Sequence, residues 1–248
     1  MAAAERAVLI LGGTSDIGRA TALAFAQRHW TVRLAGRSLP DLQREADDIS
    51  ARTGRQVTIH GFEVLDTSSF TAFVDALPEL PDVVISVVGL LGEQPRAEVD
   101  LDHAKEIIRS NYEGPALILS IFALRFLGRG YGSIVGISSV AGDRGRSSNY
   151  FYGSAKAGFS GFLSGLRNRL AIDGSIHVMT VKPGPARTKM TEHMKLPPLV
   201  TATPAEVGEA ILIGLNRRKD VIYVRSIWFF VMLIIRLMPE RIFKRLNF

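Results

Sequence analysis

Residues 7–18 of the chain read AVLILGGTSDIG, an apolar run that leads directly into a glycine-rich turn. The apolar residues at 7–11 are typical of a buried parallel strand, and residues 19–28 have the apolar spacing of a helix. A strand, a glycine turn and a helix in this order predict a dinucleotide site, because glycines let the backbone approach a pyrophosphate and the helix N-terminus attracts it. The residues that we expect to contact this cofactor are Gly12, Thr14, Ser15, Asp16, Ile17 and Gly18.

Asp16 departs from this pattern, because it stands where such a turn usually has its middle glycine. A carboxylate directed at a pyrophosphate would repel it. We therefore expect Asp16 to face away from the cofactor, where it could cap the helix.

The second predicted strand, at 31–35, ends in Gly36, Arg37 and Ser38. Enzymes that prefer NAD usually place an acid here to hold the ribose 2′-hydroxyl. Gly36 followed by Arg37 instead indicates a guanidinium for a 2′-phosphate, so NADP(H) is favoured and NAD(H) is the alternative. The competing interpretation is that Arg37 is a surface arginine without a ligand.

Strands and helices alternate along the rest of the chain, which predicts one α/β domain with a doubly wound (Rossmann) parallel sheet of seven strands. We place this domain at residues 1–225 and an apolar and basic C-terminal tail at 226–248. Glu63 and Val64 follow the third strand, and Gly89 follows the fourth; we expect all three at the cofactor, with Glu63 accepting from the adenine amino group. The further strands are expected at 56–62, 83–88, 131–138, 175–181 and 221–224, and the further helices at 39–52, 66–77, 97–126, 149–170 and 203–217.

The composition of the 248 residues is that of an ordinary globular protein, with 47% apolar and 22% charged residues. There is no cysteine, which suits a reducing cytosol, and the five histidines lack the spacing of metal ligands, so we expect no metal. Residues 1–6 lead straight into a strand, so we expect no signal peptide. The net charge of +6 indicates either a solvated basic surface or attraction to phosphates or an anionic membrane. We expect a cytoplasmic protein without a nucleic-acid partner.

Tyr152 and Lys156 lie four residues apart in a predicted helix, and therefore one turn apart on the same face. An ammonium beside a phenol favours the phenolate, so we expect Lys156 to lower the pKa of Tyr152 and to make it a usable acid or base near neutrality. Ser139, which follows a strand, could hydrogen-bond the substrate oxygen that Tyr152 protonates. The spacing of Tyr152 and Lys156 alone often arises by chance, whereas its combination with Ser139, Asn111 and the glycine turn does not.

Asn111 lies in the middle of the helical region predicted at 97–126, where its helix propensity is unfavourable. Either the helix is kinked there and Asn111 holds a water near Lys156, or Asn111 is a polar residue on a solvated face.

Together these residues resemble the classical short-chain dehydrogenases/reductases, over about residues 7–224. The resemblance implies that Asn111, Ser139, Tyr152 and Lys156 form a catalytic tetrad. It also implies that Lys156 holds the nicotinamide ribose, beside Tyr152, and that the segment from Pro183 to Thr188 contacts the nicotinamide end. Besides Asp16, the sequence SVVG at 86–89 departs from the usual Asn-Asn-Ala-Gly of the family.

Within that family, the chain is similar to reductases of decaprenylphosphoryl-2-keto-pentoses, which make a cell-wall precursor. This similarity implies a polyprenyl-phosphate-linked keto sugar, or a related lipid-linked or nucleotide-linked sugar, and NADH as the cofactor. Two alternatives remain: a reductase of an acyl or small-ketone substrate, and a non-catalytic NADP(H)-sensing protein, which would not need Ser139, Tyr152 and Lys156. The similarity is carried by residues 9–18, 89–92, Arg144 and Arg146, 187–190 and 242–246.

The tail contains nine consecutive apolar residues, IWFFVMLII at 227–235, followed by Arg236, Arg241, Lys244 and Arg245. The run is too short to span a membrane, which needs about 20 residues. We expect residues 227–245 to lie at the inner face of an anionic membrane, with a subunit interface or a cover over the substrate pocket as the alternative. The small residues of the helix at 149–170 also favour a homo-oligomer.

Overall fold

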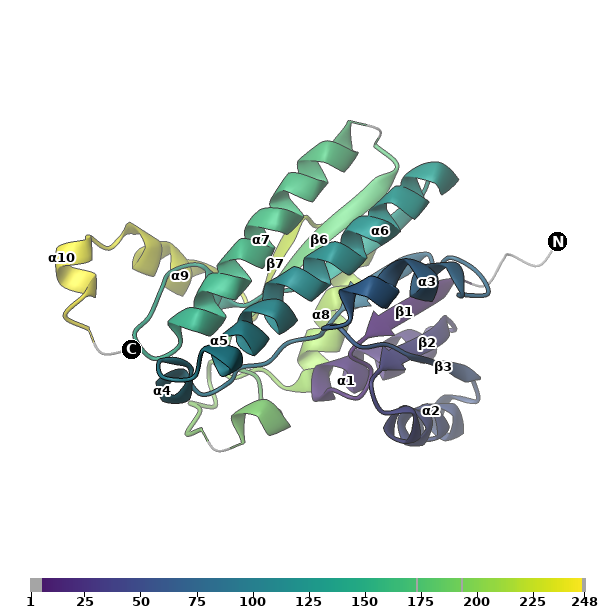
Figure 1. Ribbon diagram of the computed structural model, residues 1–248, viewed down its shortest axis with the longest axis horizontal. Helices are drawn as coiled ribbons and strands as arrows, with labels where there is room; N and C mark the ends of the chain where they lie inside the picture. Colours follow the sequence, from purple (N-terminus) through teal and green to yellow (C-terminus); the bar gives the residue numbers. More distant parts are fainter. Residues whose placement is uncertain (1–5, 173, 193, 247–248) are drawn as a thin grey trace.

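The computed structural model describes residues 6–172, 174–192 and 194–246. The expectations about a signal peptide at residues 1–5 and about His193 lie outside these residues. Within them, seven parallel strands form one sheet in the order β3-β2-β1-β4-β5-β6-β7, which confirms the predicted doubly wound fold (Figure 1). The strands are β1 Ala7–Leu11, β2 Thr31–Gly36, β3 Val57–Gly61, β4 Val83–Ser86, β5 Gly132–Ile137, β6 Ile176–Pro183 and β7 Val221–Val224.

Both faces of the sheet are covered by helices, because successive residues of each buried strand point to opposite sides. In β1, Val8 and Ile10 pack in one cluster with residues of α1, α2 and α8, while Leu9 and Leu11 pack in another with residues of α3, α6 and α7. The helices are α1 Asp16–Ala26, α2 Leu39–Thr53, α3 Phe70–Asp75, α4 Gln94–Ala97, α5 Leu101–Ile108, α6 Gly114–Arg129, α7 Tyr150–Ala171 and α8 Pro204–Asn216.

The strand order reverses at β1, which pairs with β2 on one side and with β4 on the other. Ligands of doubly wound sheets bind in the crevice beyond the carboxyl ends of the strands at such a reversal. The loops after β1, β2 and β4 therefore start at the edge where a cofactor is expected.

The helical region predicted at 97–126 begins at Leu101 in the structure and continues as α5, a π-helical turn at Arg109–Glu113 and α6, while α4 is a separate short helix before it. The extra residue of a π turn re-aims the side chains within it, and Asn111 is fully buried. The regular α-helix is therefore interrupted at Asn111, and a solvated position for Asn111 is wrong. Gly114, directly after the π turn, packs against Val64, whose carbonyl oxygen would lie 2.3 Å from an added Cβ.

The apolar tail forms α9 Ile227–Leu237 and, after Pro239, the short α10 Glu240–Phe243. Figure 1 shows both helices in yellow at the left, where α10 extends beyond the rest of the molecule. Among the described residues, no helix is both long and apolar enough to cross a membrane.

Candidate active site

A cavity of about 320 Å³ lies at the strand reversal, between the glycine turn and the segment 188–190. This volume is in the range of small-molecule sites. Four of the predicted cofactor residues, Gly18, Tyr152, Lys156 and Pro183, do not line it. The predicted residues that do line it are Gly12, Thr14, Ser15, Asp16, Ile17, Arg37, Glu63, Val64, Gly89 and Thr188.

The glycine turn is shaped to hold an anion. Gly12 has a φ of +93°, and a Cβ there would lie 3.2 Å from the backbone nitrogen of Val88. Ser15 caps α1, because its Oγ accepts from the Gly18 N–H at 3.1 Å. Among the described residues, the N–H groups of Asp16 and Ile17 have no acceptor, and both residues line the cavity. Free N–H groups at a helix N-terminus fit the pyrophosphate of a dinucleotide.

Asp16 takes a role that the sequence did not predict. It does not cap α1, and it lines the cavity instead of facing away from it. Its Oδ2 accepts a hydrogen bond of 2.7 Å from the backbone N–H of Lys189, 173 residues along the chain. Asp16 therefore joins the glycine turn to the segment after β6, across the cavity.

Arg37 lies at the mouth of the cavity with 75% of its side chain exposed. Its Nε is 3.8 Å from Oε2 of Glu63, whose Oε1 accepts from the Leu65 N–H at 3.0 Å. An exposed ion pair of this length contributes little to stability, so the guanidinium can turn toward a phosphate.

Lys156 is buried beneath the cavity floor. Its Nζ donates a hydrogen bond of 2.9 Å to the carbonyl oxygen of Ile137, at the end of β5. Burial lowers the pKa of Lys156 to about 7, because the ammonium has lost its water. A Cβ on Gly89 would lie 3.3 Å from this Nζ and 2.8 Å from Oδ1 of Asn111, so only glycine fits between them.

Tyr152 and Ser139 lie together beside this lysine. Burial raises the pKa of Tyr152, and a hydrogen bond with Ser139 lowers it in part. The Lys156 Nζ is 5.8 Å from the centroid of the Tyr152 ring. The expected lowering of the Tyr152 pKa is therefore wrong, since burial penalises the phenolate and Lys156 is itself desolvated.

Asn111 holds the loop that follows β4. Its Nδ2 donates to the carbonyl oxygens of Leu90 at 2.6 Å and Ile107 at 2.8 Å, and its Oδ1 accepts from the Leu90 N–H at 3.3 Å. The side chain thus fixes Gly89 and Leu90 over Lys156. The four predicted catalytic residues are brought together behind Gly89, which lines the cavity, although none of the four lines it.

Other residues line the cavity without having been predicted. Eight of the ten lie within two residues of a predicted cofactor contact, so their place in the sequence was a usable signal. Glu106 and Ser110 had no such signal, because they lie within the helical region that contains the π turn. The described residues contain no group of three or more histidine or acidic side chains that could hold a metal ion. The unpredicted lining residues are Gly36, Phe62, Leu65, Val87, Val88, Leu90, Glu106, Ser110, Lys189 and Met190.

Known proteins match the chain across this whole region. A family model described as short chain dehydrogenase matches residues 6–197. An uncharacterized oxidoreductase of Streptomyces coelicolor is 34% identical over 244 residues, which cover 97% of this chain and 96% of the relative. An NADP-dependent 3-hydroxy acid dehydrogenase of Schizosaccharomyces pombe is 26% identical over 90% of this chain and 92% of its own. An actinorhodin polyketide ketoreductase solved with NADPH is 25% identical, with a TM-score of 0.79 over 89% of this chain and 95% of its own.

The hydrogen bond between Asp16 and Lys189 can be tested by amide exchange. A hydrogen bond to a charged group contributes about 1.5–3 kcal/mol, so Asp16→Ala is expected to speed exchange of the Lys189 amide about tenfold or more. Asp16→Asn keeps a side-chain oxygen as acceptor and is expected to change the exchange rate of the Lys189 amide less. Asp102→Ala, in the first turn of α5, serves as the control and is expected to have no effect at Lys189. Unchanged exchange at Lys189 in Asp16→Ala would show that this contact does not hold the segment.

Proposed function

Because the chain belongs to the short-chain dehydrogenase/reductase family, and so is an oxidoreductase that uses NAD(P) on alcohol or carbonyl groups, we propose that it reduces a ketone with Tyr152 as the proton donor. The observation that carries this proposal is the grouping of Ser139 and Lys156 around Tyr152, next to Gly89 of the cavity whose glycine turn is shaped to hold an anion.

The cofactor, when bound, supplies the hydride to the carbonyl carbon. Tyr152 donates its proton to the alkoxide oxygen as it forms, and the Ser139 hydroxyl donates a hydrogen bond to the same oxygen. Burial raises the pKa of Tyr152, so the phenol has a proton to give at neutral pH, but a nearby cation must favour the phenolate for that proton to be released. Below its pKa of about 7, Lys156 carries the charge that favours the phenolate left behind. In this proposal a water held near Asn111 returns the proton through Lys156.

The proposed substrate is a keto sugar carried on a polyprenyl phosphate, as the similarity to the decaprenylphosphoryl-2-keto-pentose reductases implies. A groove of about 460 Å³ supports this choice, since it shares Asp16, Thr188 and Lys189 with the cofactor cavity. The groove adds the cation of Arg187, the carboxylate of Glu192 and apolar atoms of Met194 and Leu196. A phosphate beside Arg187 that continues into an apolar chain matches the cation and the apolar side chains.

The second candidate is a reductase of an acyl or small-ketone substrate. Two similar proteins favour it, since one is a 3-hydroxy acid dehydrogenase and the other a polyketide ketoreductase. The two candidates differ in substrate and share the same proton donor.

We propose NADPH as the preferred cofactor. Arg37 stands at the cavity mouth next to Gly36, where an acid would otherwise bind the 2′-hydroxyl. The NADP-dependent relative from Schizosaccharomyces pombe agrees with this preference.

Replacing Tyr152 tests the proposed chemistry. Tyr152→Phe keeps the ring but removes the proton donor, so turnover is expected to fall by about 10² to 10⁴ while NADPH binding stays nearly unchanged. Tyr150→Phe is the matched control, because Tyr150 lies two residues away with its hydroxyl on Glu98 and is expected to keep full activity. NADPH oxidation is followed with a panel of lipid-linked, nucleotide-linked, acyl and small ketones. Activity of Tyr152→Phe within tenfold of the natural protein would refute the assignment, and NADPH binding without turnover of any ketone would favour a sensor.

The cofactor preference can be tested at Arg37. If Arg37 binds the 2′-phosphate, Arg37→Asp is expected to weaken NADPH binding by a few kcal/mol, about 10²-fold, and to leave NADH binding unchanged or stronger. Arg217→Asp, beyond the end of α8, makes the same charge change far from the cavity and is the control. An equal loss for both cofactors would mean that Arg37 has only a structural role.

A further inference from the structure

Helix α9 has two different apolar faces. Trp228 and Met232 are buried on one face, against Val140 and neighbouring residues. On the other face Phe230 is 61% exposed, Ile234 64% and Leu237 74%. These three are spaced by four and three residues, so they form one stripe along the helix. Phe229 and Leu233 widen it, with 50% and 44% exposed.

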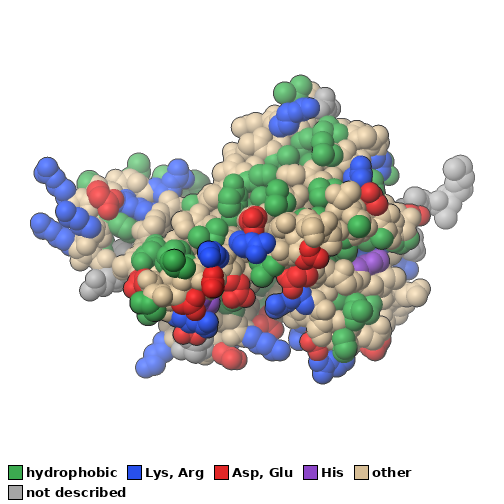
Figure 2. All heavy atoms as spheres, in the orientation of Figure 1, with side chains coloured by type: hydrophobic (Ala, Val, Ile, Leu, Met, Phe, Trp, Pro, Cys, Tyr) green, Lys and Arg blue, Asp and Glu red, His purple; other side chains and the backbone are tan. Residues whose placement is uncertain are grey.

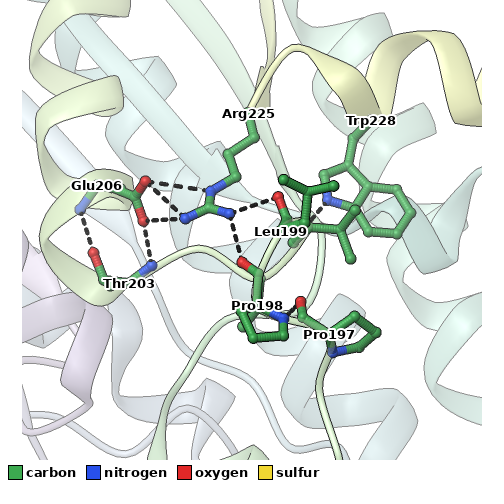
Figure 3. A network of polar contacts seen from close by, with 9 residues as sticks. Pro197, Pro198, Leu199, Thr203, Glu206, Arg225 and Trp228 are labelled. Carbon is green, nitrogen blue, oxygen red and sulfur yellow. Dashed lines mark hydrogen bonds and ion pairs between the residues drawn. The ribbon is translucent and has the colours of Figure 1, made fainter.

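The start of α9 is firmly held, so this exposure does not come from a loose tail. Just before α9, Arg225 pairs with Glu206 and donates to the carbonyl oxygens of Pro198 and Leu199 at 2.9 and 2.8 Å (Figure 3). The Trp228 indole N–H donates to the Val200 carbonyl oxygen at 2.9 Å.

The far end of α9 is held by Arg144, from the loop after β5. Its guanidinium donates to the carbonyl oxygens of Ile235 and Met238, pairs with Glu240 at 2.7 Å, and lies 4.0 Å from the ring of Phe243. The protein therefore fixes α9 with its inner face packed and its apolar stripe directed to solvent.

Cations follow the stripe along the chain. Arg236, Arg241, Lys244 and Arg245 are exposed, and the one carboxylate within residues 227–246, Glu240, is already paired with Arg144. Figure 2 shows Lys and Arg side chains gathered at the left end of the molecule, where α10 lies. An apolar stripe bordered by cations is the pattern of a helix that lies in the surface of an anionic bilayer.

We propose that α9 and α10 dock this protein on anionic lipids. The apolar stripe enters the boundary between headgroups and acyl chains, and the four cations meet lipid phosphates. With 11 residues at about 1.5 Å each, α9 is about 16 Å long and cannot cross a hydrocarbon core of about 30 Å. A second copy of the chain fits less well, because a two-fold contact uses the same surface on both copies, and the one carboxylate of this surface, Glu240, is already paired with Arg144.

Docking would also act on the cofactor cavity, because the chain between α9 and the glycine turn connects the two. Arg225 and Trp228 hold residues 198–200, and Asp16 holds Lys189, so the segment between them is attached to the docking helix at one end and to the cofactor turn at the other. This inference is independent of the substrate, because lipid binding needs neither a ketone nor a cofactor.

Sedimentation of the full chain with vesicles tests the proposal. We expect binding to vesicles of phosphatidylglycerol mixed with phosphatidylcholine, weaker binding in high salt, and little binding to phosphatidylcholine alone. The triple variant Phe230→Gln, Ile234→Gln, Leu237→Gln and the triple variant Arg241→Glu, Lys244→Glu, Arg245→Glu are each expected to lose binding at least about tenfold. Val99→Gln, at an exposed apolar residue outside α9, is the control and is expected to bind as the natural protein does.

All six substituted side chains are exposed, so the melting temperatures of both variants are expected to match the natural protein. Absence of vesicle binding by the natural protein would overturn the proposal. So would unchanged vesicle binding in both folded variants. A change from dimer to monomer in the Gln variant, without a change in vesicle binding, would show that a second copy covers the stripe instead.

Discussion

The buried ammonium of Lys156 is the constraint on which the rest of the site depends. Among the described residues, its hydrogen bond goes to the carbonyl oxygen of Ile137, and burial lowers its pKa to about 7. To keep it there, the end of β5 and the first turns of α7 must be held together, which Ser138 does by donating from its hydroxyl to the Lys156 carbonyl oxygen at 3.0 Å. Gly89 has no side chain, and a Cβ there would press on the Lys156 Nζ and on Oδ1 of Asn111. The contact between β5 and α7 also positions Tyr152 and Ser139. Tyr152 lies one helical turn before Lys156, and Ser139 directly follows Ser138.

Most of the fold could be predicted from the sequence, because buried parallel strands appear as separate apolar runs with helical patterns between them. The region after β4 could not. Its π turn lies beside contacts with distant residues: Gly114 approaches Val64, and Asn111 binds the loop at Leu90. The period of the apolar residues alone does not contain this information. The run at 227–235 is a similar case, because nine apolar residues in a row do not show which side of α9 is packed.

The candidate site could be predicted in its residues but less well in its chemistry. The motif predicted Tyr152, Lys156, Ser139 and Asn111 as one group, and the structure brings Ser139 and Lys156 to Tyr152 and places Asn111 and Lys156 against Gly89. The spacing of Tyr152 and Lys156 indicated that they are near each other but not that Lys156 is buried and Tyr152 partly buried, so the predicted direction of the Tyr152 pKa was wrong. The role of Asp16 could not be predicted either, because its partner Lys189 is distant in sequence and binds it through a backbone N–H.

A titration of the lysine side chains followed by NMR tests the role of burial at Lys156 most directly. In protein labelled with carbon-13 lysine, one Cε resonance is expected to titrate with a midpoint near pH 7, and Lys156→Met is expected to remove that resonance alone. If no lysine resonance titrated near pH 7, and the one lost in Lys156→Met titrated near the usual value of about 10.4, Lys156 would be solvated, which would contradict a site organised around a buried ammonium.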